Sequence, residues 1–179
     1  MKRSTANQRL RLSYSKLNSF ANYDREEAIA MILGKRLPTT PEMELGTAAH
    51  KIIEVEKLDL EGIGEGGVYE DKHTIELYDW LDFSFVADRR KDNVIVDYKT
   101  GSGDPLQLYV YAFLYRLMDI KVDEGRIVYV KYDPLTRCVT KKSQKRYPIK
   151  GEQLSYAWSW LDETSHEIKV ILDDLKYNW

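Results

Sequence analysis

The sequence predicts an α/β fold in which a central mixed β-sheet is flanked by helices. Two apolar runs, 81–85 and 94–96, flank a polar turn that contains Asn93, which is the pattern of a β-hairpin. A helix is expected to begin after Asp104, and a further strand is expected at 125–133. A strand, a helix and a second strand in this order predict a parallel pair joined by a helical crossover. Antiparallel and parallel pairs together make the sheet mixed.

The composition is that of a globular protein with one main domain. The chain has 179 residues, of which 43% are hydrophobic and 31% are charged. No apolar run approaches the roughly 18 residues that span a bilayer, and no signal-peptide pattern opens the sequence. We therefore expect a cytoplasmic location, in a bacterium or in the host of a virus, and no membrane partner. Residues 1–11 are expected to form a loose basic arm, and residues 12–179 the single domain.

The first third of the chain is expected to be helical. Ser13 or Ser15 suits the N-cap of one or two helices that stop near Gly34. The following elements are a linker at 38–41, a helix over 42–58, a glycine-rich loop at 62–67 and a strand over 68–78.

The second half begins with a strongly marked helix start. Asp104 suits the N-cap and Pro105 the first helical position. A basic segment ending at Pro148 is expected to return as an edge strand, because lysines discourage further pairing at an exposed edge. An amphipathic helix then closes the chain, and its Trp158 and Trp160 are more often core or interface residues than base-stacking platforms.

Charged side chains gather where the hairpin ends. Asp97 and Lys99 point to the same face of their strand, together with Ile95. Asp82 shares a face with Ser84 on the preceding strand, and a tight reversal can bring it beside Asp97. Burying such groups is costly unless they neutralise one another or hold a metal, and paired carboxylates suit Mg²⁺ or Mn²⁺. An ordinary ion pair near a strand end is the alternative interpretation.

The motifs extend beyond this pair. The segment 97–101, Asp-Tyr-Lys-Thr-Gly, is followed by Gln107 and Tyr111, and Gly-Thr-Ala-Ala-His at 46–50 and Ser-Tyr-Ser-Lys-Leu at 13–17 lie upstream. With Asp82, these residues resemble the PD-(D/E)xK nuclease superfamily, specifically its RecB-like exonuclease branch. The resemblance covers about residues 12 to 132. It implies a restriction-endonuclease-like core and a Mg²⁺- or Mn²⁺-dependent deoxyribonuclease, expected to be an exonuclease.

The number of cysteines indicates which RecB-like relatives the chain can resemble. Many RecB-like relatives, including CRISPR-associated exonucleases, carry an iron–sulfur cluster on four cysteines. Cys138 is the only cysteine here, and one thiolate cannot hold such a cluster. The resemblance therefore implies a member without an iron–sulfur cluster.

The resemblance also assigns roles to individual residues. It implies that Asp82, Asp97 and Lys99 are catalytic, with Lys99 steadying the attacking water. His50 shares a helix face with Glu54, and where the context matches the family motif it is expected to reach the metal. The implied metal ligands are His50, Asp82, Asp97 and the carbonyl of Tyr98, with Glu54 and Glu70 as additional acidic candidates; the implied DNA contacts are Gln107 and Tyr111, with Arg89, Arg90 and Lys91 as a basic turn.

Several alternatives stay open. Gln107 could serve the helix cap and Tyr111 the core. The basic runs could follow a phosphate backbone or be solvated turns, and the net charge of −2 does not by itself favour a nucleic-acid partner. These runs are Lys2, Arg3, Arg9 and Arg11; residues 89–91; and Lys141, Lys142, Lys145 and Arg146.

The expected partner is DNA, either single-stranded or at duplex ends, with a helicase or recombination protein as a further partner. Such an enzyme would act in DNA repair, recombination or the processing of viral or mobile-element DNA. The alternative from another class is a catalytically inert module that binds nucleic acid or a protein on the same fold.

Overall fold

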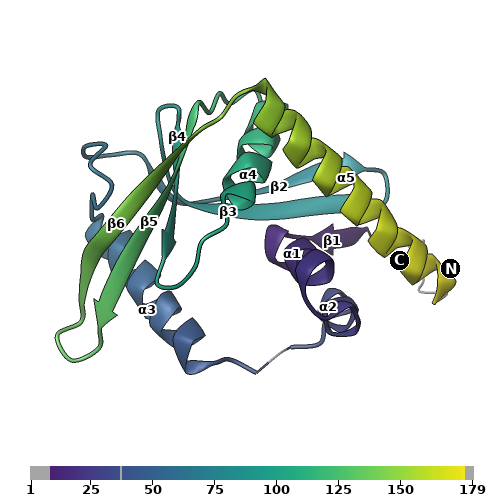
Figure 1. Ribbon diagram of the computed structural model, residues 1–179, viewed down its shortest axis with the longest axis horizontal. Helices are drawn as coiled ribbons and strands as arrows, with labels where there is room; N and C mark the ends of the chain where they lie inside the picture. Colours follow the sequence, from purple (N-terminus) through teal and green to yellow (C-terminus); the bar gives the residue numbers. More distant parts are fainter. Residues whose placement is uncertain (1–8, 37, 176–179) are drawn as a thin grey trace, which may run out of the picture. The chain divides into compact units, whose positions relative to one another are not determined.

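The computed structural model describes residues 9–36 and 38–175, which form a six-stranded sheet and five helices (Figure 1). The strands are β1 (Leu10–Leu12), β2 (Val68–Tyr78), β3 (Leu81–Lys91), β4 (Val94–Lys99), β5 (Glu124–Asp133) and β6 (Cys138–Pro148). The helices are α1 (Tyr14–Asn22), α2 (Arg25–Ile32), α3 (Pro41–Glu56), α4 (Pro105–Leu117) and α5 (Gly151–Asp174).

The described residues divide into two compact units. One contains residues 9–36, 73–85 and 158–175, and the other contains 38–72 and 86–157. The strand order is β1-β3-β4-β5-β6, and β2 pairs with β3 outside this path. Strands β2 and β3 and helix α5 contribute residues to both units.

The first unit contains a short strand where a loose arm was predicted. β1 pairs in parallel with β3, with Leu10 opposite Leu81 and Leu12 opposite Phe83. Leu10 and Leu12 are buried, so burial of two leucines outweighs the polar character of the surrounding sequence. The predicted arm is therefore wrong at its inner end, and its residues 1–8 lie outside the described part of the chain.

The second unit contains the predicted hairpin of β3 and β4. Arg89 pairs with Val96 and Lys91 with Val94 in antiparallel register, which leaves Asp92 and Asn93 as the turn. Asp92 has a φ of 49°, a left-handed conformation that Asp tolerates better than most residues. The hairpin expected from the sequence is confirmed, but its turn is shorter than predicted, because Arg89, Arg90 and Lys91 belong to β3. The two-residue turn sets the register of the hairpin.

Helix α4 makes the predicted crossover to a parallel strand. β5 pairs in parallel with β4, so that Ile127 lies opposite Asp97 and Tyr129 opposite Lys99. β6 then pairs antiparallel to β5 and is the last strand in the order, which confirms the predicted edge strand. The sheet is mixed, as the sequence predicted.

Helices α3 and α4 cover opposite faces of β4 and β5. Ala49 and Ile53 of α3 pack in one apolar cluster with Tyr98 and Val128. On the opposite face, a Cβ on Gly125 would lie 2.9 Å from Leu108 Cδ1 of α4, so glycine permits this close approach. None of the described helices combines the length and apolar character that crossing a membrane requires.

Candidate active site

The end of β4 brings an acidic and a basic side chain together. Lys99 Nζ lies 3.0 Å from Asp97 Oδ1. Gln107 of α4 contacts both, since its Nε2 donates to Asp97 Oδ1 over 3.1 Å and its Oε1 accepts from Lys99 Nζ over 3.2 Å. The start of α4 is held by Asp104, whose carboxylate accepts a hydrogen bond from the Leu106 N–H. The crossover helix therefore contributes directly to the environment of the pair.

Asp97 is a buried carboxylate with an open oxygen. The residue is 4% exposed, and its Oδ2 has no hydrogen-bond partner among the described residues. Burial, followed by repulsion from Asp88, raises the pKa of Asp97 to about 7, although Lys99 and His50 oppose the shift. A buried, unpaired carboxylate oxygen is destabilising unless something positive meets it. This oxygen fits a cation.

Asp88 is the carboxylate that β3 brings to the site. The pair of Arg89 and Val96 is the last in the ladder of β3 and β4, and Asp88 and Asp97 are the residues that come next to it on the two strands. Asp88 Oδ2 accepts a hydrogen bond from the Tyr98 N–H over 2.6 Å, and its proximity contributes to the raised pKa of Asp97. Asp88 was not among the residues predicted from the sequence, although counting back from the turn at Asp92 and Asn93 leads to it.

The structure corrects the prediction that Asp82 lies beside Asp97. Asp82 belongs to the other unit, on the part of β3 that pairs with β1, where its partner is Arg11. Its Oδ1 accepts a hydrogen bond from Arg9 Nη1 over 3.3 Å. Asp82 and Asp88 point to the same face of β3, because they are an even number of residues apart. The sequence therefore predicted the correct face of β3 for the carboxylate near Asp97, but the wrong residue along the strand.

His50 of α3 contacts Tyr98 and Asp88, which lie on β4 and β3. Its Nε2 donates to the Tyr98 carbonyl over 2.8 Å, and its Nδ1 lies 3.4 Å from Asp88 Oδ1. Burial alone would lower the pKa of His50, but the hydrogen bond and charge of Asp88 outweigh it and raise the pKa to about 9. Two atoms predicted as metal ligands, the imidazole nitrogen and the Tyr98 carbonyl oxygen, are therefore in direct contact.

Glu70 completes a group of potential metal ligands. Ligand atoms of His50, Glu70 and Asp88 all lie within 4.8 Å of one another. Glu70 has a φ of 51° although it lies in β2, and such outliers in non-glycine residues are concentrated at functional sites. Loss of water contact, followed by repulsion from Asp88, raises the pKa of its carboxyl group.

Glu54 is placed differently from Glu70. Its Oε2 accepts from Lys51 Nζ over 3.0 Å, one turn away on α3, so its charge is already paired. Both acids line an open hollow of about 490 Å³ that also reaches His50 and, along α3, Met43, Gly46 and Thr47. The hollow gives His50 and Glu70 of the ligand group access to solvent.

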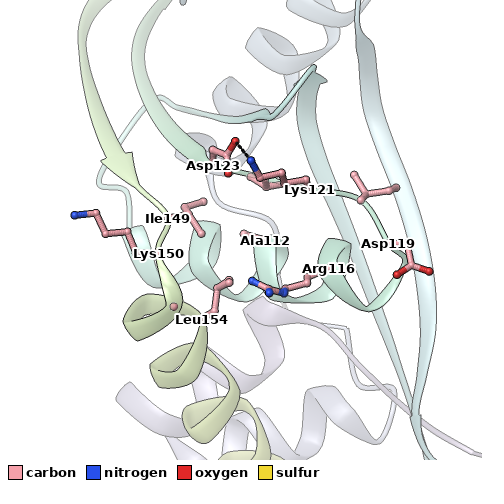
Figure 2. A pocket seen from close by; sticks show the side chains of 11 residues that line it. Ala112, Arg116, Asp119, Lys121, Asp123, Ile149, Lys150 and Leu154 are labelled. Carbon is pink, nitrogen blue, oxygen red and sulfur yellow. Dashed lines mark ion pairs between the residues drawn. The ribbon is translucent and has the colours of Figure 1, made fainter.

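A second hollow of about 320 Å³ lies between the end of α4 and the start of α5 (Figure 2). Apolar side chains such as Ile149 and Leu154 line it beside an ion pair in which Lys121 Nζ lies 2.9 Å from Asp123 Oδ2. It contains none of the residues that the sequence predicted for the site.

These residues form a donor set suited to hard divalent cations. Asp88, Asp97 and Glu70 offer carboxylate oxygens, Tyr98 a carbonyl oxygen and His50 an imidazole nitrogen, which Mg²⁺ and Mn²⁺ accept. The ligand atoms of His50, Glu70 and Asp88 lie together, and the buried Oδ2 of Asp97 is an oxygen without a partner among the described residues.

Comparison with known proteins gives structural likeness only. No family model matches the chain, and no curated protein matches it by sequence. A solved structure from Eubacterium rectale, provisionally described as an exonuclease, is 12% identical, and the match covers 92% of this chain and 82% of that one with a TM-score of 0.64. An alkaline exonuclease from Laribacter hongkongensis (LHK-Exo) is 14% identical over 94% of this chain and 93% of its own, with a TM-score of 0.54.

The chain has the fold of these exonucleases. Its mixed sheet with flanking helices is a restriction-endonuclease-like α/β core, as the resemblance implied. The end of β4 and the start of α4 supply Asp97, Lys99 and Gln107 within this nuclease fold.

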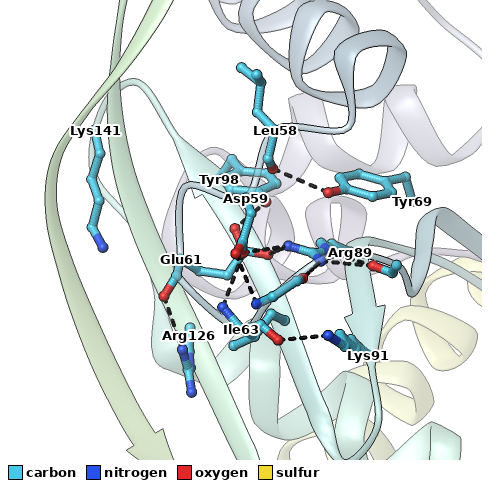
Figure 3. Close-up of polar contacts among 12 residues, drawn as sticks. Leu58, Asp59, Glu61, Ile63, Tyr69, Arg89, Lys91, Tyr98, Arg126 and Lys141 are labelled. Atoms are coloured by element: carbon cyan, nitrogen blue, oxygen red, sulfur yellow. Dashed lines mark hydrogen bonds and ion pairs between the residues drawn. The ribbon is translucent and has the colours of Figure 1, made fainter.

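The basic residues predicted to contact DNA make hydrogen bonds and ion pairs within the protein; Figure 3 shows those of Arg89 and Lys91. Arg89 is 0% exposed, and its guanidinium donates to Glu61, to Asp59 and to carbonyls of the glycine-rich loop. Lys91 Nζ donates to the Ile63 carbonyl over 2.7 Å. Arg90 Nε lies 2.6 Å from Asp71 Oδ2. The prediction is therefore wrong for Arg89, because a side chain without exposed surface cannot reach a phosphate, and the other two cations already have partners.

This buried cluster also supports the site. Glu61 is almost fully buried and accepts a hydrogen bond from the Tyr98 hydroxyl over 2.5 Å as well as from Arg89. Tyr98 lies between Asp97 and Lys99, and its main chain bonds to Asp88 and His50. The cluster therefore anchors the residue whose backbone connects the candidate ligands. Glu61 was not predicted from the sequence, because it lies in a loop and no periodic pattern surrounds it.

Gln107 and Tyr111 have different surroundings. Gln107 is not the cap residue, because its amide contacts Asp97, Lys99 and the Tyr111 hydroxyl, to which Nε2 donates over 3.2 Å. Tyr111 is 8% exposed, and burial raises its pKa above the ordinary value for tyrosine. The core interpretation therefore describes Tyr111, while Gln107 lies at the site.

Proposed function

We propose that this protein is a deoxyribonuclease, specifically an exonuclease, that hydrolyses phosphodiester bonds in DNA with Mg²⁺ or Mn²⁺. The observation that carries the proposal is the buried, unpaired Oδ2 of Asp97, in a carboxylate whose other oxygen pairs with Lys99 and whose pKa is influenced by the charges of Asp88 and His50. The fold shared with two exonucleases supports it. We assign the protein to the RecB-like branch of the PD-(D/E)xK superfamily on the motifs 46–50, 97–101 and Gln107-x-x-x-Tyr111.

The residues that would hold the ion are Asp88, Asp97, Glu70, His50 and the carbonyl of Tyr98. When bound, a divalent ion supplies positive charge to the phosphate and lowers the pKa of a water molecule. His50 must lose a proton before it can act as a ligand, since its pKa is raised to about 9 without the ion. Asp88 replaces Asp82 in this assignment because it accepts a hydrogen bond from the Tyr98 N–H and its charge contributes to the raised pKa of Asp97.

Lys99 and Gln107 have roles toward the substrate. The Lys99 ammonium would stabilise the negative charge that develops on the phosphate and orient the attacking water. Gln107 bridges Lys99 and Asp97 and so keeps the ammonium at the carboxylate. Tyr111 positions Gln107 through its hydroxyl. Repair, recombination or the processing of viral or mobile-element DNA is the proposed setting, and a helicase or recombination partner stays a prediction.

Digestion of end-labelled DNA tests this function. Single- and double-stranded substrates would be incubated with Mg²⁺, Mn²⁺ or chelator, with Asp97→Ala alongside. We expect metal-dependent shortening by the wild type, reduced by at least about 100-fold in Asp97→Ala, since one electrostatic element at a reacting centre has effects of this order. Binding of DNA without cleavage under any metal would support the inert binding module instead.

A further inference from the structure

The sheet face that carries Asp97 and Lys99 continues onto the neighbouring strands. Residues paired across a sheet share a face. Tyr129 of β5 is the partner of Lys99, and Ile127 is the partner of Asp97. Lys145 of β6 is in turn the partner of Ile127. Lys145 therefore lies on the same face as Asp97, two strands away, at a distance of about 10 Å by ordinary strand spacing.

An aromatic ring and an ammonium group meet on this face. Lys145 Nζ lies 5.9 Å from the centroid of the Tyr129 ring. Tyr129 is half-buried, and Lys145 is exposed. Lys131 is also exposed, and it shares this face because it follows Tyr129 by two residues along β5. A half-exposed ring with flanking cations is the combination that binds single-stranded nucleic acid.

A β-bulge assigns the basic residues of β6 to different faces. The register shifts between Tyr129 and Val130, whose partners are Ser143 and Lys141, so Lys142 is the extra residue. Without the bulge, Lys141 would share the face of Lys145, because the two are an even number of residues apart. With the bulge, Lys141 pairs with Val130 and lies on the α3 face, where Val130 packs against the cluster of Ala49 and Ile53.

The hairpin of β5 and β6 also extends past the end of β4. The last residue of β4, Lys99, pairs with Tyr129, whereas β5 continues to Asp133 (Figure 1). Lys131 lies on this extension, beyond the reach of β4. The face thus continues away from Asp97 in two directions, toward the extension and toward the edge strand.

We propose that Tyr129, Lys131 and Lys145 form the surface that holds a nucleic-acid strand next to its scissile phosphate. The inference rests on the proposed function and specifies where that substrate lies. The backbone of Lys145 lies about 10 Å from that of Asp97, and its ammonium lies over the Tyr129 ring, so it meets a phosphate next to the reacting one. Tyr129, beside Lys99, stacks with a base or sugar. The basic run 89–91 does not supply these phosphate contacts, because its side chains donate hydrogen bonds to other residues of the protein.

Binding of a fluorescent single-stranded oligonucleotide in chelator tests the proposal without requiring cleavage. Affinity would be measured over a range of salt concentrations for the wild type, Lys145→Gln and Lys131→Gln. Each substitution should weaken binding and lower the slope of log affinity against log salt by about 0.7, the value for one phosphate contact on a single strand. Tyr129→Ala should lose about tenfold in affinity, and Tyr129→Phe should retain it because the ring is kept.

Lys141→Gln is the matched control, since it removes the same charge from the same strand on the opposite face. It should leave both affinity and salt slope unchanged. Equal effects of Lys141→Gln and Lys145→Gln, no effect of Lys145→Gln, or no binding by the wild type would overturn the proposal. Normal binding by a wild type that cleaves no DNA would contradict the proposed function and leave this surface supported.

Discussion

Asp88 and Asp97 lie close enough for their negative charges to repel each other, even though Lys99 and His50 offset part of this repulsion. Repulsion from Asp88 is, after burial, the main cause of the raised pKa of Asp97. Asp82 is chemically the same side chain on the same face of β3, but Arg9 already meets its charge. The two β3 carboxylates therefore make a clean comparison.

We predict that Asp88→Asn lowers metal-dependent cleavage by at least about 100-fold, because an amide is a poorer ligand and removes one negative charge from the site. Asp82→Asn should retain near wild-type cleavage. Initial rates on labelled DNA at saturating Mn²⁺, with calorimetric Mn²⁺ titration of both variants, measure the difference. Loss of activity in Asp82→Asn with normal Mn²⁺ binding would restore Asp82 as a catalytic residue.

At the scale of elements, the loop between α3 and β2 is held by one buried guanidinium. Arg89 Nη1 lies 2.8 Å from Asp59 Oδ1 and also pairs with Glu61, while Arg89 Nη2 donates to the Gly66 carbonyl over 2.7 Å. Its guanidinium also lies 4.9 Å from the Tyr69 ring. The loop is thus held by a buried charged cluster in addition to the apolar contacts of Leu58, Leu60 and Ile63.

Arg89→Met should lower the free energy of unfolding by about 3–5 kcal/mol, because it leaves Glu61 buried without a counter-charge. Arg89→Met combined with Glu61→Met should recover part of that loss, since the uncompensated charge is gone. Urea unfolding of both single variants and the double variant measures the coupling. Arg116→Met, at an exposed site in the last turn of α4, is the control and should change stability by less than about 0.5 kcal/mol. Additive losses in the double variant would contradict the interpretation.

At the scale of the whole molecule, two shifted groups make stability depend on pH. The pKa of Asp97 is raised from 3.8 to about 7 in the fold, so the folded state holds this proton more tightly, and stability falls as pH rises through that interval. The pKa of His50 is raised from 6.5 to about 9, so its contribution is complete below 6.5 and is lost as pH rises toward 9. Both effects have the same sign.

We therefore predict that the metal-free protein becomes progressively less stable between about pH 4 and pH 9. Urea unfolding in chelator at several pH values measures this slope. Asp97→Asn should flatten the lower part of the curve and His50→Gln the upper part. Mn²⁺ should raise stability most at high pH, because its ligands must be deprotonated. Stability that rises with pH in chelator would contradict the assigned shifts.

Local patterns determined much of the fold and part of the site. Alternation along a strand placed Asp97 and Lys99 on one face, the polar turn predicted the hairpin, and Asp104 with Pro105 predicted the start of α4. Each of these depends on interactions within a few residues, which the sequence order contains directly.

Only the tertiary structure decided which charges meet. Asp82 pairs with Arg11 of β1 while Asp88 lies near Asp97, the loop folded over Arg89 and removed it from the surface, and a bulge separated Lys141 from Lys145. One carboxylate on a strand cannot be told from another by the local sequence, and the same holds for cations. Their roles depend on partners that are distant in sequence. A shift of one residue in register changes the face of a side chain, and a buried partner changes whether its charge is available.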